Sequence, residues 1–177
     1  MTRSLTAALC LSLGLPAGVR ADDPEPKGRP ATELLAAGLA EAGTGGKAVF
    51  LAFGSPSCGW CKYLDKFHAR PAVAKALARH LVFVKVDVVD NPGGQELYKK
   101  YTPPSGGGVP VWVVLSADGE VLADSFEDKK KNVGFPYQPN ELAHYETAMR
   151  AALPKLTDDE VALLMRELKA AGPEKKK

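Results

Sequence analysis

The sequence contains few cysteines, few aromatic residues and no strong excess of charge of either sign. Its 177 residues include 3 cysteines and 7 % aromatic residues, and the formal net charge is +2. Lysine and arginine are scattered, apart from short lysine runs at 129–131 and 175–177. No nucleic-acid partner is therefore indicated. Hydrophobic residues make up 45 % of the chain, which is enough for the core of one globular domain.

The chain also lacks an apolar run long enough to span a bilayer. The apolar stretch at 5–18 is shorter than the roughly 20 residues that a membrane helix needs. It follows a basic start with Arg3, and Val19 and Ala21 stand at the small-residue positions of a cleavage site. We therefore predict a secretory signal peptide over 1–21. This implies a periplasmic or secreted protein with no stable membrane insertion after cleavage.

Cleavage after Ala21 simplifies both the charge and the cysteine content. It removes Arg3, Arg20 and no acid, so 21 basic and 21 acidic residues remain and balance. It also removes Cys10. The exported chain keeps only two cysteines, in a compartment where disulfides persist. A single close pair in a domain of this size does not fit a fold held together by disulfides.

The domain organisation follows from the composition along the chain. We predict a Pro-rich, disordered lead-in over 22–31, one domain over 32–172 and a basic tail over 173–177. No internal repeat is present. No separate dimerisation domain is visible either, so we expect a monomer.

The hydrophobic pattern predicts helices alternating with strands. Helices are expected near 32–42, 62–69, 71–80, 139–153 and 157–171, and a turn leads into a short helix within 91–101. Thr157 and Glu160 have the spacing of a capping box at the start of the last helix. Strands are expected at 47–53, 81–88, 109–116 and 120–126, with a loop over 127–138. Connecting helices indicate parallel crossovers, and the turn at 117–119 indicates an antiparallel hairpin. The expected fold class is therefore α/β: a mixed four-stranded sheet with helices on both faces and an extra C-terminal helix.

Cys58 and Cys61 form the motif with the most chemical content. The apolar strand at 47–53 runs directly into it, and a helical pattern follows, so Cys58 is expected at a helix N-terminus. Unpaired N–H groups and the helix dipole stabilise an anion there, which lowers the pKa of a thiol. Cys61 lies three residues on, on the same helix face, where it can resolve a mixed disulfide. Trp60 provides an apolar surface at the rim or is simply a half-buried aromatic residue.

Other uses of a CxxC pair fit less well. Lys62 follows Cys61, which excludes the CxxCH motif of covalent haem. A structural zinc site needs four ligands, and the three histidines show no paired spacing. A structural disulfide would close a loop too small to restrict the unfolded chain much. A copper-carrying thiol site with a distant histidine stays open at this point.

Three segments together resemble the thioredoxin superfamily, over roughly 47–126. They are "AVFLAFGSPSCGWCK", "VFVKVDVVDNPGGQELYKKY" and "GVPVWVVLSADGEVL", in the order and spacing of the family. The segment "NVGFPYQPNELAHY" is similar, more weakly, to the tail of exported members with a CGWC centre. The resemblance implies a thioredoxin-like fold, redox-active Cys58 and Cys61, and no cofactor or metal. It further implies a cis Val109–Pro110 bond against the CxxC, with the Val109 backbone pairing with the substrate chain.

Two departures from the family pattern bear on the chemistry. Ala52 stands where the family commonly buries an aspartate that accepts the proton of the resolving cysteine. The accompanying lysine is present as Lys85, which becomes the candidate proton relay, with solvent and Asp87 as alternatives; Lys85 is otherwise a lysine that reaches out to water. The dipeptide between the cysteines is Gly-Trp, where thioredoxins proper have Gly-Pro, so the redox potential is not carried over.

The sequence therefore favours an exported thiol–disulfide oxidoreductase that acts through a mixed-disulfide intermediate. Its expected partners are protein thiols or disulfides and a redox partner that recharges the CxxC pair. The direction of transfer stays open, because differences of tens of millivolts decide it. A non-enzymatic thioredoxin-like binding module, an adaptor or a copper-handling protein, is the alternative, motivated by Ala52.

Overall fold

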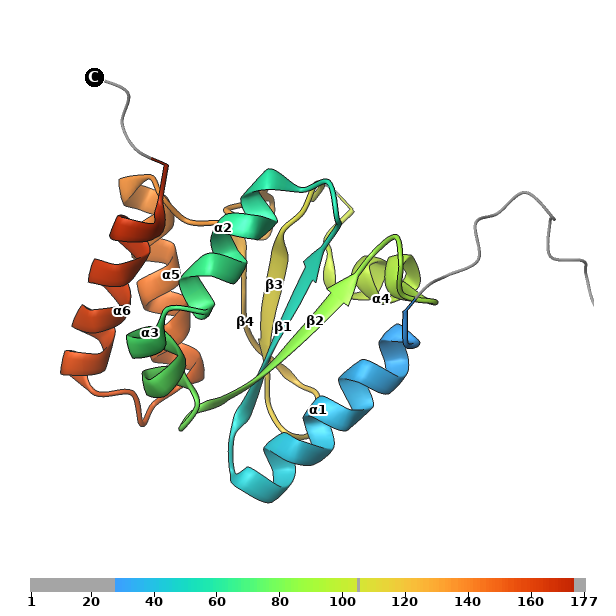
Figure 1. Cartoon of the computed structure of the whole chain (residues 1–177), viewed down its shortest axis with the longest axis horizontal. Helices are drawn as coiled ribbons and strands as arrows, with labels where there is room; N and C mark the ends of the chain where they lie inside the picture. The colour runs from blue at the N-terminus through green and yellow to red at the C-terminus, as the bar shows by residue number, and fades with distance from the viewer. Residues whose placement is uncertain (1–27, 105, 174–177) are drawn as a thin grey trace, which may run out of the picture.

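The computed structural model describes residues 28–104 and 106–173, which form a sheet enclosed by helices (Figure 1). The helices are α1 (Ala31–Gly45), α2 (Gly59–His68), α3 (Pro71–Leu77), α4 (Gly94–Tyr101), α5 (Pro139–Ala152) and α6 (Asp158–Ala171). The strands are β1 (Ala48–Gly54), β2 (Leu81–Asp87), β3 (Val111–Leu115), β4 (Val121–Asp124), β5 (Phe126–Glu127) and β6 (Lys131–Asn132). The predicted signal peptide over 1–21, residues 22–27 of the lead-in and residues 174–177 of the tail lie outside the described residues.

The four-stranded sheet has the order β2-β1-β3-β4 and confirms the predicted mixed sheet. All seven residues of β1 are buried, because this apolar run lies between two strands and under helices on both faces. β1 pairs with β2 in parallel and with β3 antiparallel, and β3 pairs with β4 antiparallel as the predicted hairpin. In this register Ala52 lies opposite Lys85 on one side and Trp112 on the other.

The predicted parallel crossover from β2 to β3 is wrong. β2 ends at Asp87 opposite Gly54, and β3 begins at Val111 opposite Phe53. β2 therefore ends, and β3 begins, at the same end of the sheet, beside the C-terminal end of β1. A strand that starts where the previous strand stopped must run in the opposite direction, even though α4 lies between the two strands.

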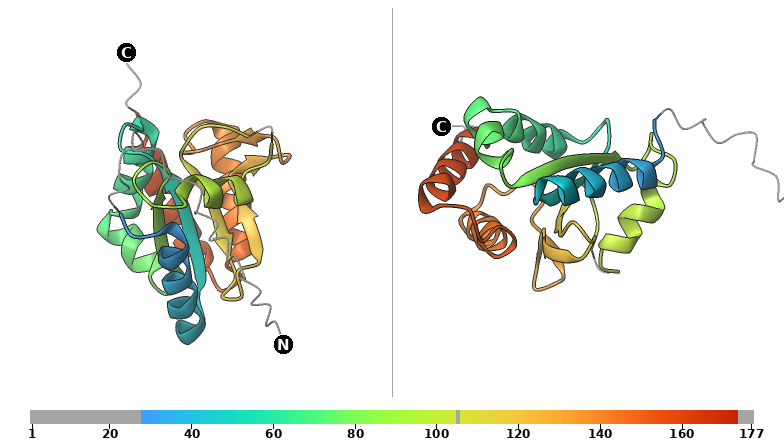
Figure 2. Two further views of the ribbon diagram at one scale, coloured as in Figure 1. Left: turned by 90° about the vertical axis from the view of Figure 1, so that its right-hand side faces the viewer. Right: turned by 90° about the horizontal axis from the view of Figure 1, so that it is seen from below.

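Two helical layers cover the two faces of the sheet (Figures 1 and 2). Alternate residues of β1, such as Phe50 and Ala52, face α2, α3, α5 and α6, which supply most of the larger core. The other alternate residues, such as Leu51 and Phe53, face α1 and α4. The CxxC helix α2 therefore lies in the larger layer, directly above the face that carries Ala52.

Two boundaries differ from the sequence-based expectation. The backbone N–H groups of Gly28 and Ala31 donate to the carbonyl oxygens of Asp90 and Pro92, each at 2.9 Å. The last four residues of the predicted lead-in, 28–31, thus belong to the folded domain. The amino-acid composition of a segment cannot reveal hydrogen bonds between its backbone and a distant loop. The short hairpin β5–β6 begins at Phe126, the last residue of the predicted strand 120–126, and continues into the predicted loop over 127–138; its strands are too short for a periodic pattern.

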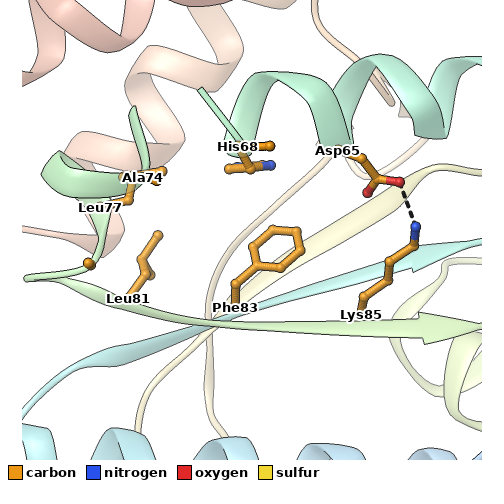
Figure 3. A pocket seen from close by; sticks show the side chains of 9 residues that line it. Asp65, His68, Ala74, Leu77, Leu81, Phe83 and Lys85 are labelled. Carbon is orange, nitrogen blue, oxygen red and sulfur yellow. Dashed lines mark hydrogen bonds and ion pairs between the residues drawn. The ribbon is translucent and has the colours of Figure 1, made fainter. Parts of the chain in front are cut away.

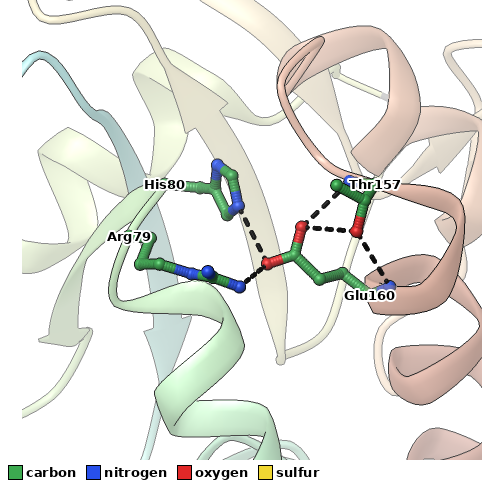
Figure 4. A network of polar contacts seen from close by, with 4 residues as sticks. All are labelled: Arg79, His80, Thr157 and Glu160. Atoms are coloured by element: carbon green, nitrogen blue, oxygen red, sulfur yellow. Dashed lines mark hydrogen bonds and ion pairs between the residues drawn. The ribbon is translucent and has the colours of Figure 1, made fainter.

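A polar network fixes the N-terminus of the extra helix α6 to the start of β2. The predicted capping box is confirmed: Thr157 and Glu160 each accept a hydrogen bond from the other's backbone N–H. Arg79 and His80 also donate to the Glu160 carboxylate (Figure 4). The buried carboxylate of Glu160 thus connects the start of α6 to the two residues that precede β2.

Candidate redox site

The two cysteines lie at the N-terminus of α2, where the sequence placed them. Cys58 is the N-cap residue, and its Sγ accepts a hydrogen bond of 3.0 Å from the N–H of Cys61. The sulfurs of Cys58 and Cys61 form a disulfide in the structure, and their Cα atoms are 5.3 Å apart. Cys58 is partly exposed, whereas Cys61 is only 4 % exposed. The outer sulfur is therefore the one that a large partner can reach.

The segment before β3 lies directly against this disulfide. The Sγ of Cys58 is 3.3 Å from the carbonyl oxygen of Val109, and the Val109–Pro110 peptide bond is cis. Pro110 is buried, and its own carbonyl oxygen accepts a hydrogen bond of 2.9 Å from the Asn132 side chain. The three residues Cys58, Val109 and Pro110 are thus brought together from two distant parts of the chain.

A cleft of about 240 Å³ lies next to Trp60 and to Val109, whose carbonyl oxygen contacts Cys58. One wall is the backbone of 107–110, from the Gly-rich loop, and the other is built by Trp60 and Tyr137. The rings of Trp60 and Tyr137 stack with centroids 5.0 Å apart, and Phe135 stacks behind Trp60 at 6.4 Å. Trp60 is 42 % and Tyr137 40 % exposed, so the wall presents an aromatic surface to solvent.

The structure brings Lys85 under the CxxC helix together with a residue that the sequence analysis did not assign. The Nζ of Lys85 lies 2.5 Å from Oδ2 of Asp65, which is on α2 one turn after Cys61. The other acid considered, Asp87, instead accepts hydrogen bonds from the N–H groups of Val89 and Asp90 in the following turn. Asp65, not Asp87, is therefore the carboxylate beside Lys85.

This ion pair borders a second, mostly apolar pocket of about 470 Å³ between α2, α3 and β2 (Figure 3). Figure 3 shows Asp65 and Lys85 at one end, Leu77 and Leu81 at the other, and Phe83 between them. His68 also lines this pocket, and burial lowers the pKa of its imidazole from 6.5 to about 4.

Sequence reasoning missed Phe135, Tyr137 and Asp65 as parts of the site. Phe135 and Tyr137 lie in the segment "NVGFPYQPNELAHY", which resembles the tail of exported members with a CGWC centre, but no site residue was taken from that weaker similarity. Asp65 carried one usable signal, since a residue four positions after Cys61 shares its helix face. That spacing alone does not reveal a lysine on a neighbouring strand.

Two further properties of the site concern metals and membranes. Residues 28–104 and 106–173 contain no group of three or more His, Cys, Asp or Glu side chains arranged to hold a metal ion. Among the helices of this same part of the chain, none combines the length and apolar character needed to cross a bilayer.

Comparisons with known proteins agree with this geometry. The family model Thioredox_DsbH, described as "Protein of unknown function, DUF255", matches residues 32–167. The uncharacterized protein B0495.5 of Caenorhabditis elegans is 31 % identical over 97 residues. That match covers 51 % of this chain but only 13 % of the worm protein, so the chain spans a small part of that relative's length.

Two solved structures show the same fold. The crystal structure of a disulphide isomerase from Xylella fastidiosa Temecula1 covers 89 % of this chain and 98 % of its own, with a TM-score of 0.50 and 23 % identity. The solution structure of a putative disulphide-isomerase from Bacteroides thetaiotaomicron covers 65 % and 87 %, with a TM-score of 0.50 and 27 % identity. The predicted thioredoxin-like architecture is thereby confirmed.

Proposed function

Because the chain belongs to the Thioredox_DsbH family, we propose that it is a thiol–disulfide oxidoreductase acting on protein thiols or disulfides. The observation that carries this proposal is the Cys58–Cys61 disulfide at the N-terminus of α2, with its outer sulfur 3.3 Å from the Val109 carbonyl oxygen. The two solved structures of the same fold, a disulphide isomerase and a putative one, belong to the same class of chemistry.

Cys58 is the attacking residue in this proposal, and Cys61 is the resolving residue. Cys58 is the more exposed sulfur and caps a helix N-terminus, which favours its thiolate. Its thiolate attacks a substrate disulfide; one substrate sulfur leaves as a thiolate, and a mixed disulfide forms. Cys61 then loses its proton and attacks the Cys58 sulfur, which releases the second substrate thiolate. Two electrons pass to the substrate, and water supplies the protons for both leaving thiolates.

Substrate binding is assigned to Trp60, Val109 and Pro110, with Tyr137 added by the structure. An extended chain in the cleft would pair with the Val109 backbone on one side, as in strand addition. On the other side, the side chains of the substrate would pack against the stacked rings of Trp60 and Tyr137. A cleft of about 240 Å³ has room for one or two side chains on either side of a substrate cysteine, and the proposed exchange between thiols and disulfides uses no cofactor.

The cellular setting is proposed from the sequence. A signal peptide over 1–21 would direct the domain over 32–172 to the periplasm or outside the cell, where a separate redox partner recharges the cysteine pair. The domain would act there as a monomer.

A Cys61→Ser variant tests the function directly. Without the resolving thiol, the mixed disulfide on Cys58 cannot be released, so exported proteins should accumulate as covalent adducts that reductant removes. Cys58→Ser is the matched control and should form none. If Cys61→Ser captures nothing, and the wild-type protein reduces neither insulin nor glutathione-capped thiols, the binding-module alternative replaces the enzyme.

A further inference from the structure

The backbone segment beside the outer cysteine has little stiffness of its own. Residues 106–108 are consecutive glycines, which can adopt many more backbone conformations than other residues. Gly107 and Gly108 are exposed, and Val109 is only partly buried. Yet the carbonyl oxygen of Val109 lies 3.3 Å from the Sγ of Cys58. Contacts with other parts of the chain must therefore hold this segment at that distance.

The carbonyl groups on either side of Val109 are each bound by a side chain. The Gly108 carbonyl oxygen accepts a hydrogen bond of 3.2 Å from the hydroxyl group of Tyr98 on α4. The Pro110 carbonyl oxygen accepts one of 2.9 Å from Nδ2 of Asn132 on β6. The first bond is exposed to water, whereas the second is shorter and partly buried. Because a hydrogen bond shielded from water contributes more, Asn132 is the stronger anchor.

The amide group of Asn132 is itself fixed at both of its polar atoms. Its Oδ1 accepts a hydrogen bond of 3.0 Å from the backbone N–H of Gly134, while its Nδ2 donates to Pro110. Turning the amide over would set oxygen against oxygen, so only this orientation satisfies both partners. The Gly134 carbonyl oxygen in turn accepts a hydrogen bond of 2.9 Å from Nε1 of Trp112, which is fully buried. Asn132 thus connects the exposed segment to the close-packed core.

The β5–β6 hairpin brings Asn132 and Gly134 against the segment that precedes β3. Asn132 pairs with Phe126 across this hairpin. Gly134 has a φ of +55°, which favours glycine, and a Cβ there would lie 3.4 Å from the Pro110 carbonyl oxygen. Among the described side chains that line the cleft, only Asn132 donates a hydrogen bond to the backbone of 107–110.

We propose that Asn132 is a positioning residue, which holds the backbone of 108–110 beside Cys58 in the arrangement that a substrate chain pairs with. The proposal rests on the function proposed above, in which the Val109 backbone binds an extended substrate. Asn132 acts through Pro110 and takes no part in the exchange of thiols and disulfides. Because the substrate and the transition state would use the same backbone pairing, loss of Asn132 should weaken the binding of both equally.

Asn132→Asp removes the donated hydrogen bond but keeps the side-chain shape and the acceptor for Gly134. It should raise KM about tenfold for a disulfide-linked peptide that extends on both sides of its cysteine, and leave kcat unchanged. The rate with hydroxyethyl disulfide should stay as in wild type, because this small substrate has no peptide group to pair with Val109. Asn132→Ala should give the same results without adding a charge.

Asn91→Asp is the matched control. The Asn91 amide also joins two backbone segments, since its Nδ2 donates to the Arg29 carbonyl oxygen at 2.9 Å and its Oδ1 accepts from the N–H of Asp87. Asn91 does not line the cleft, so this variant should leave KM unchanged for both substrates. An equal rise in KM at both positions would show a general loss of structure and refute the proposal. A rise with Asn132→Asp but not with Asn132→Ala would trace the effect to the added charge and refute it as well.

Amide hydrogen exchange separates a failure of this inference from a failure of the proposed function, because it needs no substrate. The amides of 107–109 should exchange faster in both Asn132 variants than in wild type, and at the wild-type rate in Asn91→Asp. Faster exchange in a protein whose wild type reduces neither substrate would refute the oxidoreductase function and keep the anchoring by Asn132. Unchanged exchange, or faster exchange with an unchanged KM for the peptide, would refute the positioning role and keep the function.

Discussion

The Sγ atom of Cys58 lies 3.3 Å from the carbonyl oxygen of Val109, although the two residues are 51 positions apart in the chain. The contact places the partly exposed sulfur beside the backbone of Val109 on one side. The stacked rings of Trp60 and Tyr137 form the other side of the same cleft. Under the proposed function, the covalent chemistry and the recognition of a substrate chain would meet at this cleft.

Removing one ring of the aromatic wall should lower kcat/KM for substrates that carry a bulky side chain near the cysteine. Tyr137→Ala should lower kcat/KM about fivefold for a peptide disulfide with an adjacent Phe or Trp, since a stacked aromatic pair contributes roughly 1 kcal/mol. Reduction of glutathione disulfide, which has no aromatic side chain, should change little. Leu122→Ala is the control, because Leu122 is similarly exposed, at 42 %, but lies on β4 away from the cleft. If Tyr137→Ala lowered kcat/KM equally for the aromatic peptide and for glutathione disulfide, the assignment of Tyr137 to substrate binding would be contradicted.

The close packing of α1 on β2 gives a second prediction. A Cβ on Gly38 would lie 2.2 Å from Cγ2 of Val84, a stiff β-branched side chain buried in the core. Gly38→Ala should therefore destabilise the fold by about 1–3 kcal/mol, despite the better helix propensity of alanine.

Gly43→Ala in the same helix is the internal control for Gly38. Its nearest atom is the Cβ of Ala117 at 4.0 Å, an ordinary contact, so only the propensity gain remains. This variant should be more stable by up to about 1 kcal/mol. Chemical denaturation of both variants measures the difference, and equal effects at 38 and 43 would mean that the helix does not lie this close to β2.

Sequence predicted the elements that depend on local patterns. The apolar run at 48–54 is a strand buried on both faces, the cysteines begin a helix, and the Thr157–Glu160 capping box begins another. Each of these is encoded within a few adjacent residues, so no knowledge of the rest of the fold is needed.

The features that the sequence did not reveal are contacts between distant segments. The reversed direction of β3 depends on where the chain re-enters the sheet, not on the periodicity of the strand itself. Lys85 meets Asp65 only because α2 folds back over β2, and Tyr137 meets Trp60 only because the β5–β6 hairpin turns the chain toward the CxxC. The candidate site was therefore half predictable: its cysteines were, and its surrounding charges and aromatic wall were not.

His68 should make the folded state sensitive to mild acid. Three phenylalanine rings lie against its imidazole, its Nε2 is buried without a partner, and burial lowers its pKa from 6.5 to about 4. Between these two values the unfolded chain binds a proton that the folded protein does not, so stability falls as the pH drops from 6.5 to 4. The slope approaches about 1.4 kcal/mol per pH unit. His68→Leu should flatten this part of the stability profile, as measured by urea unfolding at a series of pH values.

A direct observation of the ring checks the same assignment. Nδ1 of His68 is 3.1 Å from the Leu64 carbonyl oxygen, which only accepts, so Nδ1 carries the proton of the neutral ring. NMR of the folded protein at pH 5 should show this neutral tautomer. A charged His68 at that pH would contradict the prediction, whatever the stability of the variant.

Glu160 should control stability at lower pH. Hydrogen bonds from the backbone and side chain of Thr157 and from His80 lower the pKa of its carboxyl from 4.5 to about 2, the backbone bond first (Figure 4). The folded state thus keeps the carboxylate ionised where the unfolded chain protonates it. The stabilisation is complete above about pH 4.5 and is lost as the pH falls toward 2. Glu160→Gln should remove this dependence, and Thr157→Ala should cost about 1 kcal/mol through the lost cap.

The control for Glu160 is a glutamate that pairs only at the surface. Glu146 binds Arg150 one helical turn away on α5, and both side chains are at least 40 % exposed. Glu146→Gln should change the free energy of unfolding by less than about 0.5 kcal/mol and leave the acid part of the profile as in wild type. Acid titrations followed by circular dichroism separate the two cases, because only the buried carboxylate joins α6 to the start of β2. If both variants unfold along the wild-type curve between pH 4.5 and 2, the network around Glu160 is not what holds α6 in place.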